Sequence, residues 1–126
     1  MKTSYKPEDV IVLLKDITGE LQPLPLIERE KQMQQGTSSS EMLPLEYQPS
    51  KTYIQLYHQA LSKYSRKTAY AIAQLADKII SQKSTNVTLV SLARTGTPIG
   101  ILLKRYILKK YNINVPHYTI SFLPEK

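Results

Sequence analysis

A short run of small and polar residues, Ala93-Arg94-Thr95-Gly96-Thr97, lies between an apolar, β-branched segment and a proline. Arg94 offers a fixed positive charge with bidentate geometry, and Thr95 and Thr97 offer hydroxyl donors. Gly96 lets a ligand oxygen approach the backbone, and a helix that begins here presents free backbone N–H groups. Arg94, Thr95, Gly96 and Thr97 therefore predict a cradle for phosphate or pyrophosphate. An ordinary tight turn between a strand and a helix explains the same residues equally well.

The flanking segments predict where this loop lies. Val87–Leu92 has the composition of a buried strand, Pro98 starts a helix that runs to about Tyr111, and Val115–Phe122 is a second strand. Together they predict an α/β fold with one βαβ unit, parallel strands and a right-handed crossover. The loop then follows the carboxyl end of a parallel strand, where such sheets bind ligands. Its glycine spacing fits neither a Walker A loop nor the three-glycine dinucleotide motif.

The N-terminal half is predicted to be helical and irregular. Pro7–Ile17 has an apolar stripe at helical spacing, and Leu26–Gln35 predicts a polar helix that ends at Gly36. From Lys51 to Gln82 there is neither glycine nor proline, and helical periodicity continues throughout. We expect two regions: residues 1–50 as a helix and irregular wrap, and residues 51–126 as a long helix plus the start of the α/β domain.

Four tyrosines recur along the long helix, at positions 53, 57, 64 and 70. Aromatic rings at such spacing can stack on nucleic-acid bases, but we favour the alternative that they pack into the core. Because an unbroken helix of this length is long for so small a domain, a break near residues 62–66 is also considered.

Residue types that commonly catalyse reactions are scarce. The 126 residues contain no cysteine and two histidines, which excludes a disulfide, a thiolate metal site and a thiol nucleophile within them. His117 in the second predicted strand is expected to be partly buried and held by a backbone carbonyl, and His58 to lie at the surface. Ser91 and Ser121 show no base partner in the sequence. We assign no catalytic residue and no metal ligand.

Charge is distributed unevenly along the chain. The net charge is +7, made up of −3 over residues 1–50 and +10 over residues 51–126. A half so basic attracts phosphate, an acidic partner or the acidic half of its own chain, and the sequence does not separate these. No stretch reaches the length of a membrane span, so we expect one soluble, cytoplasmic domain without membrane contact.

Several segments carry a family resemblance: SYKPEDVIVLLKDIT (4–18), SEMLPLEYQPS (40–50), VTLVSLARTGTPIGILLKRYI (87–107) and VPHYTIS (115–121). They resemble the N-terminal part of a bacterial family found in tellurium-resistance and stress-response gene clusters. That family is described as phosphoribosyltransferase-like and, under another label, as the cysteine protease StiP family. The resemblance covers nearly the whole chain, and the block Leu-Ala-Arg-Thr-Gly-Thr-Pro-Ile-Gly is its most specific part.

The resemblance implies a Rossmann-like phosphoribosyltransferase sheet, with residues 94–97 as the pyrophosphate loop that binds phosphoribosyl pyrophosphate and Mg²⁺. The acidic strand-loop with a Thr-Gly motif that such enzymes use for the ribose phosphate is missing here. We therefore expect an incomplete sheet and an N-terminal fragment, inactive alone, that binds a small phosphorylated ligand. The alternatives are a StiP-type protease family member without its catalytic part, or a non-enzymatic basic module for an acidic partner or, less favoured, nucleic acid. A homo-oligomer is left open.

Overall fold

The computed structural model describes residues 3–122, except for the side chain of Ser40. The described residues form two compact units, one made of residues 3–14 and 51–121 and the other of residues 15–50 with Phe122. The first unit contains the predicted βαβ segment and the candidate loop.

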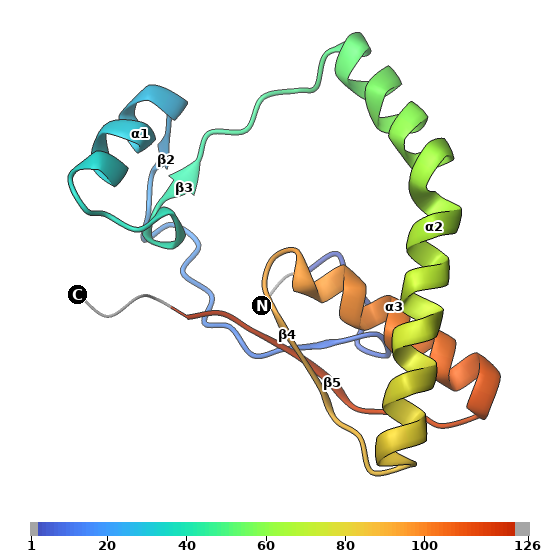
Figure 1. Cartoon of the computed structure of the whole chain (residues 1–126). Helices are drawn as coiled ribbons and strands as arrows, with labels where there is room; N and C mark the ends of the chain where they lie inside the picture. Colours follow the sequence, from blue (N-terminus) through green and yellow to red (C-terminus); the bar gives the residue numbers. More distant parts are fainter. Residues whose placement is uncertain (1–2, 123–126) are drawn as a thin grey trace. The chain divides into compact units, whose positions relative to one another are not determined.

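The first unit is built on a parallel sheet of three strands in the order β1-β5-β4. β4 (Leu89–Leu92), α3 (Gly96–Tyr111) and β5 (His117–Ile120) follow one another along the chain, and β4 pairs directly with β5 (Figure 1). The predicted βαβ unit with parallel strands is therefore confirmed. β1 (Ile11–Val12) pairs with the other edge of β5, so that an N-terminal segment adds a third strand to the sheet.

The core of this unit lies between two helices and the sheet. α3 packs on β4 and β5, and α2 (Lys51–Lys83) packs on α3 (Figure 1). Only the C-terminal part of α2 takes part, because the buried residues of α2 are Ile72 and Ala76. Burying these apolar side chains is the main force that holds the two helices together. The buried cluster consists of Ile72, Ala76, Leu103, Ile107 and Val115.

The two faces of the sheet differ in polarity. Ser91, His117 and Thr119 are buried on the face that α3 covers. Side chains alternate along a strand, so their neighbours lie on the opposite face. There Val90 is 61 % exposed, and Leu92 and Ile120 are exposed as well. Parallel sheets are normally covered on both faces, and within the first unit α3 packs on one face of this sheet.

The second unit contains short elements and few buried side chains. β2 (Pro23–Leu24) and β3 (Leu43–Pro44) form a parallel pair, with α1 (Leu26–Gln34) and the 3-10 turn η1 (Ser39–Glu41) between them. None of the residues of α1 is buried, which confirms the predicted polar helix. Gly36 follows that helix with φ +96°, a backbone conformation that favours glycine, as predicted for a helix end.

The predicted helix over Pro7–Ile17 is wrong. The backbone N–H groups of Asp9 and Val10 both donate to the carbonyl of Lys6, which closes a turn, and β1 follows. The run Val10-Ile11-Val12 is β-branched, and such residues pack well on a pleated sheet. The edge of β5 supplies backbone hydrogen-bond partners for this run. The segment therefore forms a strand, although its apolar residues also have helical spacing.

Two expectations for the long helix are also wrong. α2 runs from Lys51 to Lys83 without a break at residues 62–66. Its tyrosines do not enter the core: Tyr53, Tyr57, Tyr64 and Tyr70 are 49–66 % exposed. All four tyrosines precede Ile72, the first buried residue of α2. α3 also starts at Gly96 rather than at Pro98.

Candidate functional site

The candidate loop joins the carboxyl end of β4 to α3, where the sequence places it. Arg94 and Thr95 are exposed and Gly96 is half-buried. Among the described residues, no backbone carbonyl accepts the N–H groups of Thr95 and Gly96. The peptide bond between Ala93 and Arg94 is cis. A charged side chain and two free donors are therefore presented together at the surface.

Thr97 lies differently from its neighbours in the loop. It is only 2 % exposed, and its hydroxyl lies 2.7 Å from the hydroxyl of Thr119 on β5. Its backbone N–H donates to the carbonyl of Arg94. Thr97 thus connects the start of α3 to the sheet, and the groups of the loop that face solvent belong to Arg94, Thr95 and Gly96.

A pocket of about 320 Å³ opens beside this loop. Thr95 and Gly96 form one side, and Ser91 and His117 lie on its sheet side. Apolar residues of β4 and α3 complete the lining. The pocket is therefore a mainly apolar recess with a few polar groups, as is typical of small-ligand sites. The apolar lining residues are Leu89, Val90, Leu92, Ile99 and Leu103.

Ser91 and His117 form a hydrogen-bonded pair beneath α3. The hydroxyl of Ser91 lies 2.8 Å from Nε2 of His117, and Nδ1 lies 2.9 Å from the backbone carbonyl of Asp9. Because that carbonyl can only accept a hydrogen bond, Nδ1 carries the ring proton, and Nε2 accepts a hydrogen bond from the hydroxyl of Ser91. The expectation that a backbone carbonyl holds His117 is confirmed. The expectation that Ser91 lacks a base partner is wrong.

The hydrogen-bonded pair of Ser91 and His117 is buried. Ser91 is 8 % exposed and His117 is 2 % exposed, so the pair satisfies two polar groups inside the unit. Gly100 of α3 lies against the imidazole: a Cβ at this position would be 2.2 Å from Nε2. His58, in contrast, is exposed on α2 as expected. The pair thus joins β4, β5 and the segment before β1 beneath the helix that carries the loop.

An ion pair fixes the N-terminal segment against α3. Nε of Arg105 lies 2.7 Å from Oδ1 of Asp9, and Nη2 lies 2.6 Å from Oδ2, which gives a bidentate contact. The Arg105 guanidinium holds the pKa of Asp9 below its ordinary value, and the carboxylate raises the pKa of Arg105. Because the Asp9 carbonyl also orients His117, this ion pair supports the position of the imidazole.

A second charged cluster joins α2 to α3 around Asp77. The Asp77 carboxylate accepts from the hydroxyl of Tyr111 at 2.6 Å, from Nζ of Lys110 at 2.9 Å and from the hydroxyl of Tyr106 at 3.0 Å. These hydrogen bonds, with that of Tyr111 first, lower the pKa of Asp77, and the carboxylate raises the pKa of Lys110 and of Tyr111. The cluster is structural, because it lies away from the loop.

The Asp77 cluster predicts a pH dependence of stability. A carboxylate whose folded pKa lies below 3.8 stabilises the fold above that pH, and its contribution is lost as the pH falls through the folded pKa. Urea unfolding of Asp77→Asn should therefore show lower stability at neutral pH and a smaller loss on acidification than the wild type. Glu46→Gln, which removes an exposed carboxylate, is the control. An unchanged acid dependence in Asp77→Asn would contradict the assignment.

No group of three or more His, Cys, Asp or Glu residues among residues 3–122 is placed to hold a metal ion. Within the same residues, every helix is too short or too polar to cross a membrane.

Comparison with known proteins identifies the family. A family model described as "Tellurite-like stress resistance cysteine protease StiP" matches residues 3–126. The chain belongs to the StiP family. It is 30 % identical over 124 residues to a cysteine protease StiP of Acinetobacter baylyi (strain ATCC 33305 / BD413 / ADP1). The aligned residues make up 98 % of this chain and 32 % of the relative. No solved structure matches the chain.

The family match agrees with the resemblance of the sequence segments to the StiP family. It does not include the second description of that family, as phosphoribosyltransferase-like. The matching descriptions name a stress-resistance cysteine protease, and neither of them mentions a phosphoribosyltransferase. The chain spans about a third of the length of the curated relative that it matches. None of the 126 residues is a cysteine, so this StiP-family chain contains no thiol nucleophile of its own.

Proposed function

We propose that this chain acts in stress resistance of the StiP type, as the part of such a protein that binds and positions rather than the part that supplies the thiol. The observation that carries the proposal is the match of the family model to residues 3–126. The thiol of a cysteine protease must be deprotonated and aligned with its substrate. Because these 126 residues contain no cysteine, that thiol would come from polypeptide outside them.

The pocket between β4 and α3 is the proposed point of contribution. It lies at the carboxyl end of a parallel strand, next to a helix N-terminus, and combines an apolar lining with the polar groups of the loop. Ser91 and His117 line this pocket as a buried pair whose hydrogen bonds are already made within the unit. Such a recess would orient a bound group for chemistry done by another part of the protein.

A segment exchange tests this proposal. In Acinetobacter baylyi, the region of the relative that aligns with this chain would be replaced by residues 1–126, and survival would be measured under tellurite stress. We expect the exchanged protein to restore survival to a strain that lacks the relative. An exchanged protein as abundant as the native relative but without effect on survival would contradict the proposed function. The intact relative and the empty strain are the controls.

A second candidate function is favoured by the loop itself, which would bind pyrophosphate or a phosphoribosyl group. Exposed Arg94 and the free N–H groups of Thr95 and Gly96 are donors of the kind that bind phosphate oxygens. The family resemblance implies phosphoribosyl pyrophosphate with Mg²⁺ as the ligand. Since residues 3–122 offer no group of three carboxylates, Mg²⁺ would be held chiefly by the diphosphate oxygens.

Arg94→Ala should weaken pyrophosphate binding by about 1.5 to 3 kcal/mol, because a charge-assisted contact is lost. The measurement is a titration of the chain with pyrophosphate and Mg²⁺, followed by amide chemical shifts. Shifts should be concentrated in residues 93–99. The matched control is Arg66→Ala, which removes an exposed arginine on α2 and should leave the affinity unchanged. Scattered shifts, or none at millimolar pyrophosphate, would contradict this function.

A further inference from the structure

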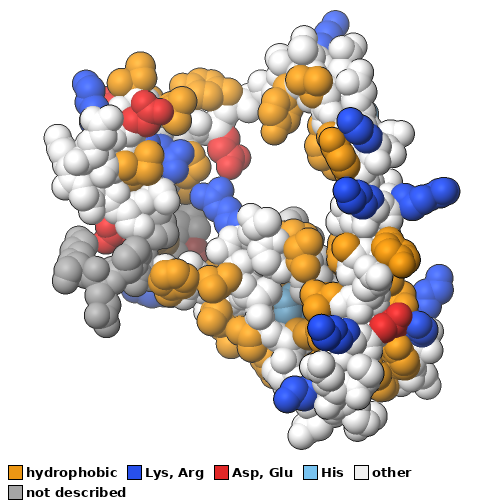
Figure 2. Space-filling view, in the orientation of Figure 1, with side chains coloured by type: hydrophobic (Ala, Val, Ile, Leu, Met, Phe, Trp, Pro, Cys, Tyr) orange, Lys and Arg blue, Asp and Glu red, His pale blue; other side chains and the backbone are white. Residues whose placement is uncertain are grey.

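The N-terminal half of α2 carries an apolar face that the described residues leave uncovered. Tyr57 is 58 % exposed, Leu61 50 % and Tyr64 49 %. They follow one another at spacings of three and four residues, and the same stripe continues into Thr68 and Ile72. The stripe is thus the extension of the surface that packs on α3. Figure 2 shows hydrophobic and basic side chains together on this exposed part of the molecule.

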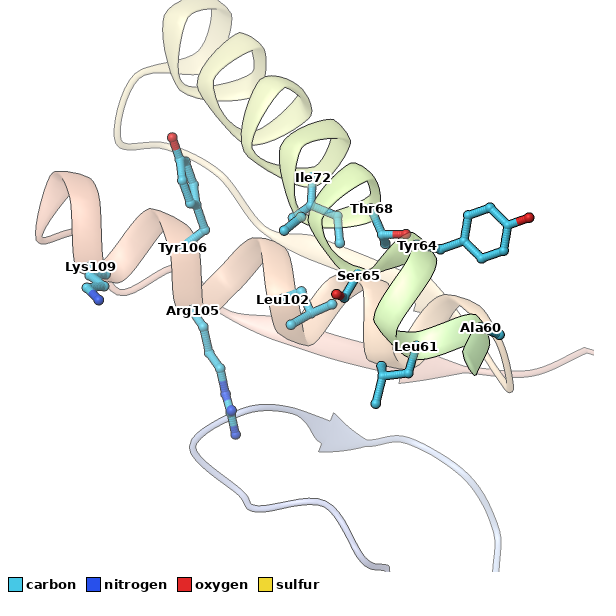
Figure 3. A pocket seen from close by; sticks show the side chains of 11 residues that line it. Ala60, Leu61, Tyr64, Ser65, Thr68, Ile72, Leu102, Arg105, Tyr106 and Lys109 are labelled. Carbon is cyan, nitrogen blue, oxygen red and sulfur yellow. The ribbon is translucent and has the colours of Figure 1, made fainter. Parts of the chain in front are cut away.

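This face ends in a groove of about 560 Å³ between α2 and α3. Figure 3 shows Leu61 and Ser65 on the α2 side and Leu102 on the α3 side, with Tyr106 further along α3. Nearly all of the groove is apolar, and it opens toward the uncovered part of α2. Its shape and lining are those of a groove that receives the apolar face of a helix.

The charged side chains at the groove are all basic. Lys109 lines the groove from α3, and Lys67 lines the adjoining recess on α2. None of the residues that line these two recesses is acidic, and α2 has no acidic residue before Asp77. Arg105 also lines the groove, but its guanidinium is engaged by Asp9. An occupant with carboxylates beside its apolar face fits these charges, whereas a second copy of so basic a helix would be repelled.

We propose that this groove receives an acidic amphipathic helix from the part of StiP-type proteins that has no counterpart in these 126 residues. The inference rests on the proposed function, in which this chain works together with such polypeptide. The relative offers the necessary length, because the alignment covers only 32 % of it. Anchors at i, i+3 and i+7 of the incoming helix would contact Leu61, Tyr64 and Leu102, and carboxylates on its flanks would face Lys67 and Lys109.

The test uses overlapping 20-residue peptides that cover the two thirds of the Acinetobacter relative outside the alignment. The labelled chain is applied to these peptides, and the affinity of each bound peptide is then measured by fluorescence anisotropy. We expect binding to a peptide with an apolar stripe at helical spacing and a net negative charge. Absence of binding to any such peptide would overturn the proposal.

Matched variants locate the binding surface. Leu61→Ser and Tyr64→Ser should each weaken peptide binding by about tenfold or more, as expected for apolar anchors. Both side chains are half-exposed, so their loss should leave the fold intact. Tyr70→Ser removes a tyrosine of α2 that is 66 % exposed and lines neither recess, and it should have no effect.

Charge reversal provides the second arm. The double variant Lys67→Glu, Lys109→Glu should weaken binding of the acidic peptide, whereas Lys83→Glu at the far end of α2 should not. Ile120→Ser tests the exposed sheet face instead. Loss of binding in Ile120→Ser with none in Leu61→Ser would assign the partner to the exposed face of the sheet and overturn the groove proposal.

Two other occupants are distinguished by the same samples. Sedimentation of the chain alone reports self-association, and dimers abolished by Leu61→Ser would show that a second copy occupies the groove. Displacement of the peptide by RNA with a steep salt dependence would show a nucleic-acid surface. Either result overturns the proposal. Peptide binding without a functional segment exchange would overturn the proposed function alone, and a functional exchange without peptide binding would overturn the groove alone.

Discussion

Gly100→Ala should lower the free energy of unfolding by about 2 to 4 kcal/mol, although alanine is the better helix former. The added Cβ would lie 2.2 Å from Nε2 and 2.6 Å from Cε1 of His117. The imidazole cannot move aside freely, because Ser91 holds one ring nitrogen and the Asp9 carbonyl holds the other. Accommodating the methyl group must therefore break a buried hydrogen bond or shift α3 away from the sheet.

The control for this prediction is the other glycine of α3. A Cβ at Gly96 would make its nearest contact with Cβ of Ser91 at 3.5 Å, an ordinary van der Waals distance. Gly96→Ala should therefore stay within about 1 kcal/mol of the wild type. Urea unfolding of both variants measures the difference. Equal stabilities for Gly96→Ala and Gly100→Ala would contradict the close packing of α3 on His117.

The long helices and the central strands could be predicted because their patterns are long or sharply bounded. The absence of glycine and proline from Lys51 to Gln82 predicted α2 almost to its last residue. The β-branched run before the loop predicted β4, and the proline after the loop placed the start of α3 to within two residues. The long helical periodicity and the sharp boundaries around the loop are both local features of the sequence. They can therefore be recognised without knowing the tertiary contacts.

The short elements could not be predicted in this way, since their partners are distant in sequence. β1 has two residues and exists because β5 offers an edge to which it can pair. The same apolar residues have helical spacing, and no local feature separates the two outcomes. The exposure of the tyrosines on α2 depends equally on distant packing, namely on how far α3 reaches along that helix.

The candidate site was predicted in part. The position of the loop followed from the order strand, loop, helix, and the exposed donors of Arg94 and Thr95 lie there. The pairing of Ser91 with His117 could not be deduced, because these residues lie 26 positions apart and the third partner, Asp9, lies 108 positions from His117. One feature pointed toward His117: alternate residues of the second predicted strand, at positions 117, 119 and 121, are polar, whereas Ser91 lies in a largely apolar strand.

Ile107→Ala should lower the free energy of unfolding by about 2 to 5 kcal/mol, the range for truncating a large core side chain. Ile107 is fully buried and lies in the cluster that α2, α3 and Val115 share. Its neighbour Leu108 is 43 % exposed, so Leu108→Ala removes the same number of carbon atoms with a much smaller effect. Urea unfolding compares the two, and a similar loss in both would contradict the assigned core.

The same variant separates the fold of the groove from its binding surface. Ile107 holds α2 against α3 from the interior, whereas Leu61 and Tyr64 lie at the groove itself. Ile107→Ala should therefore weaken peptide binding only in proportion to the fraction of unfolded chain, and osmolytes that restore folding should restore binding. Leu61→Ser should show the opposite behaviour, with a near-native unfolding midpoint and an affinity that osmolytes do not recover. If Ile107→Ala still binds the peptide weakly after folding is restored, the bound peptide would contact the buried cluster around Ile107, and the proposed binding surface at Leu61 and Tyr64 would be contradicted.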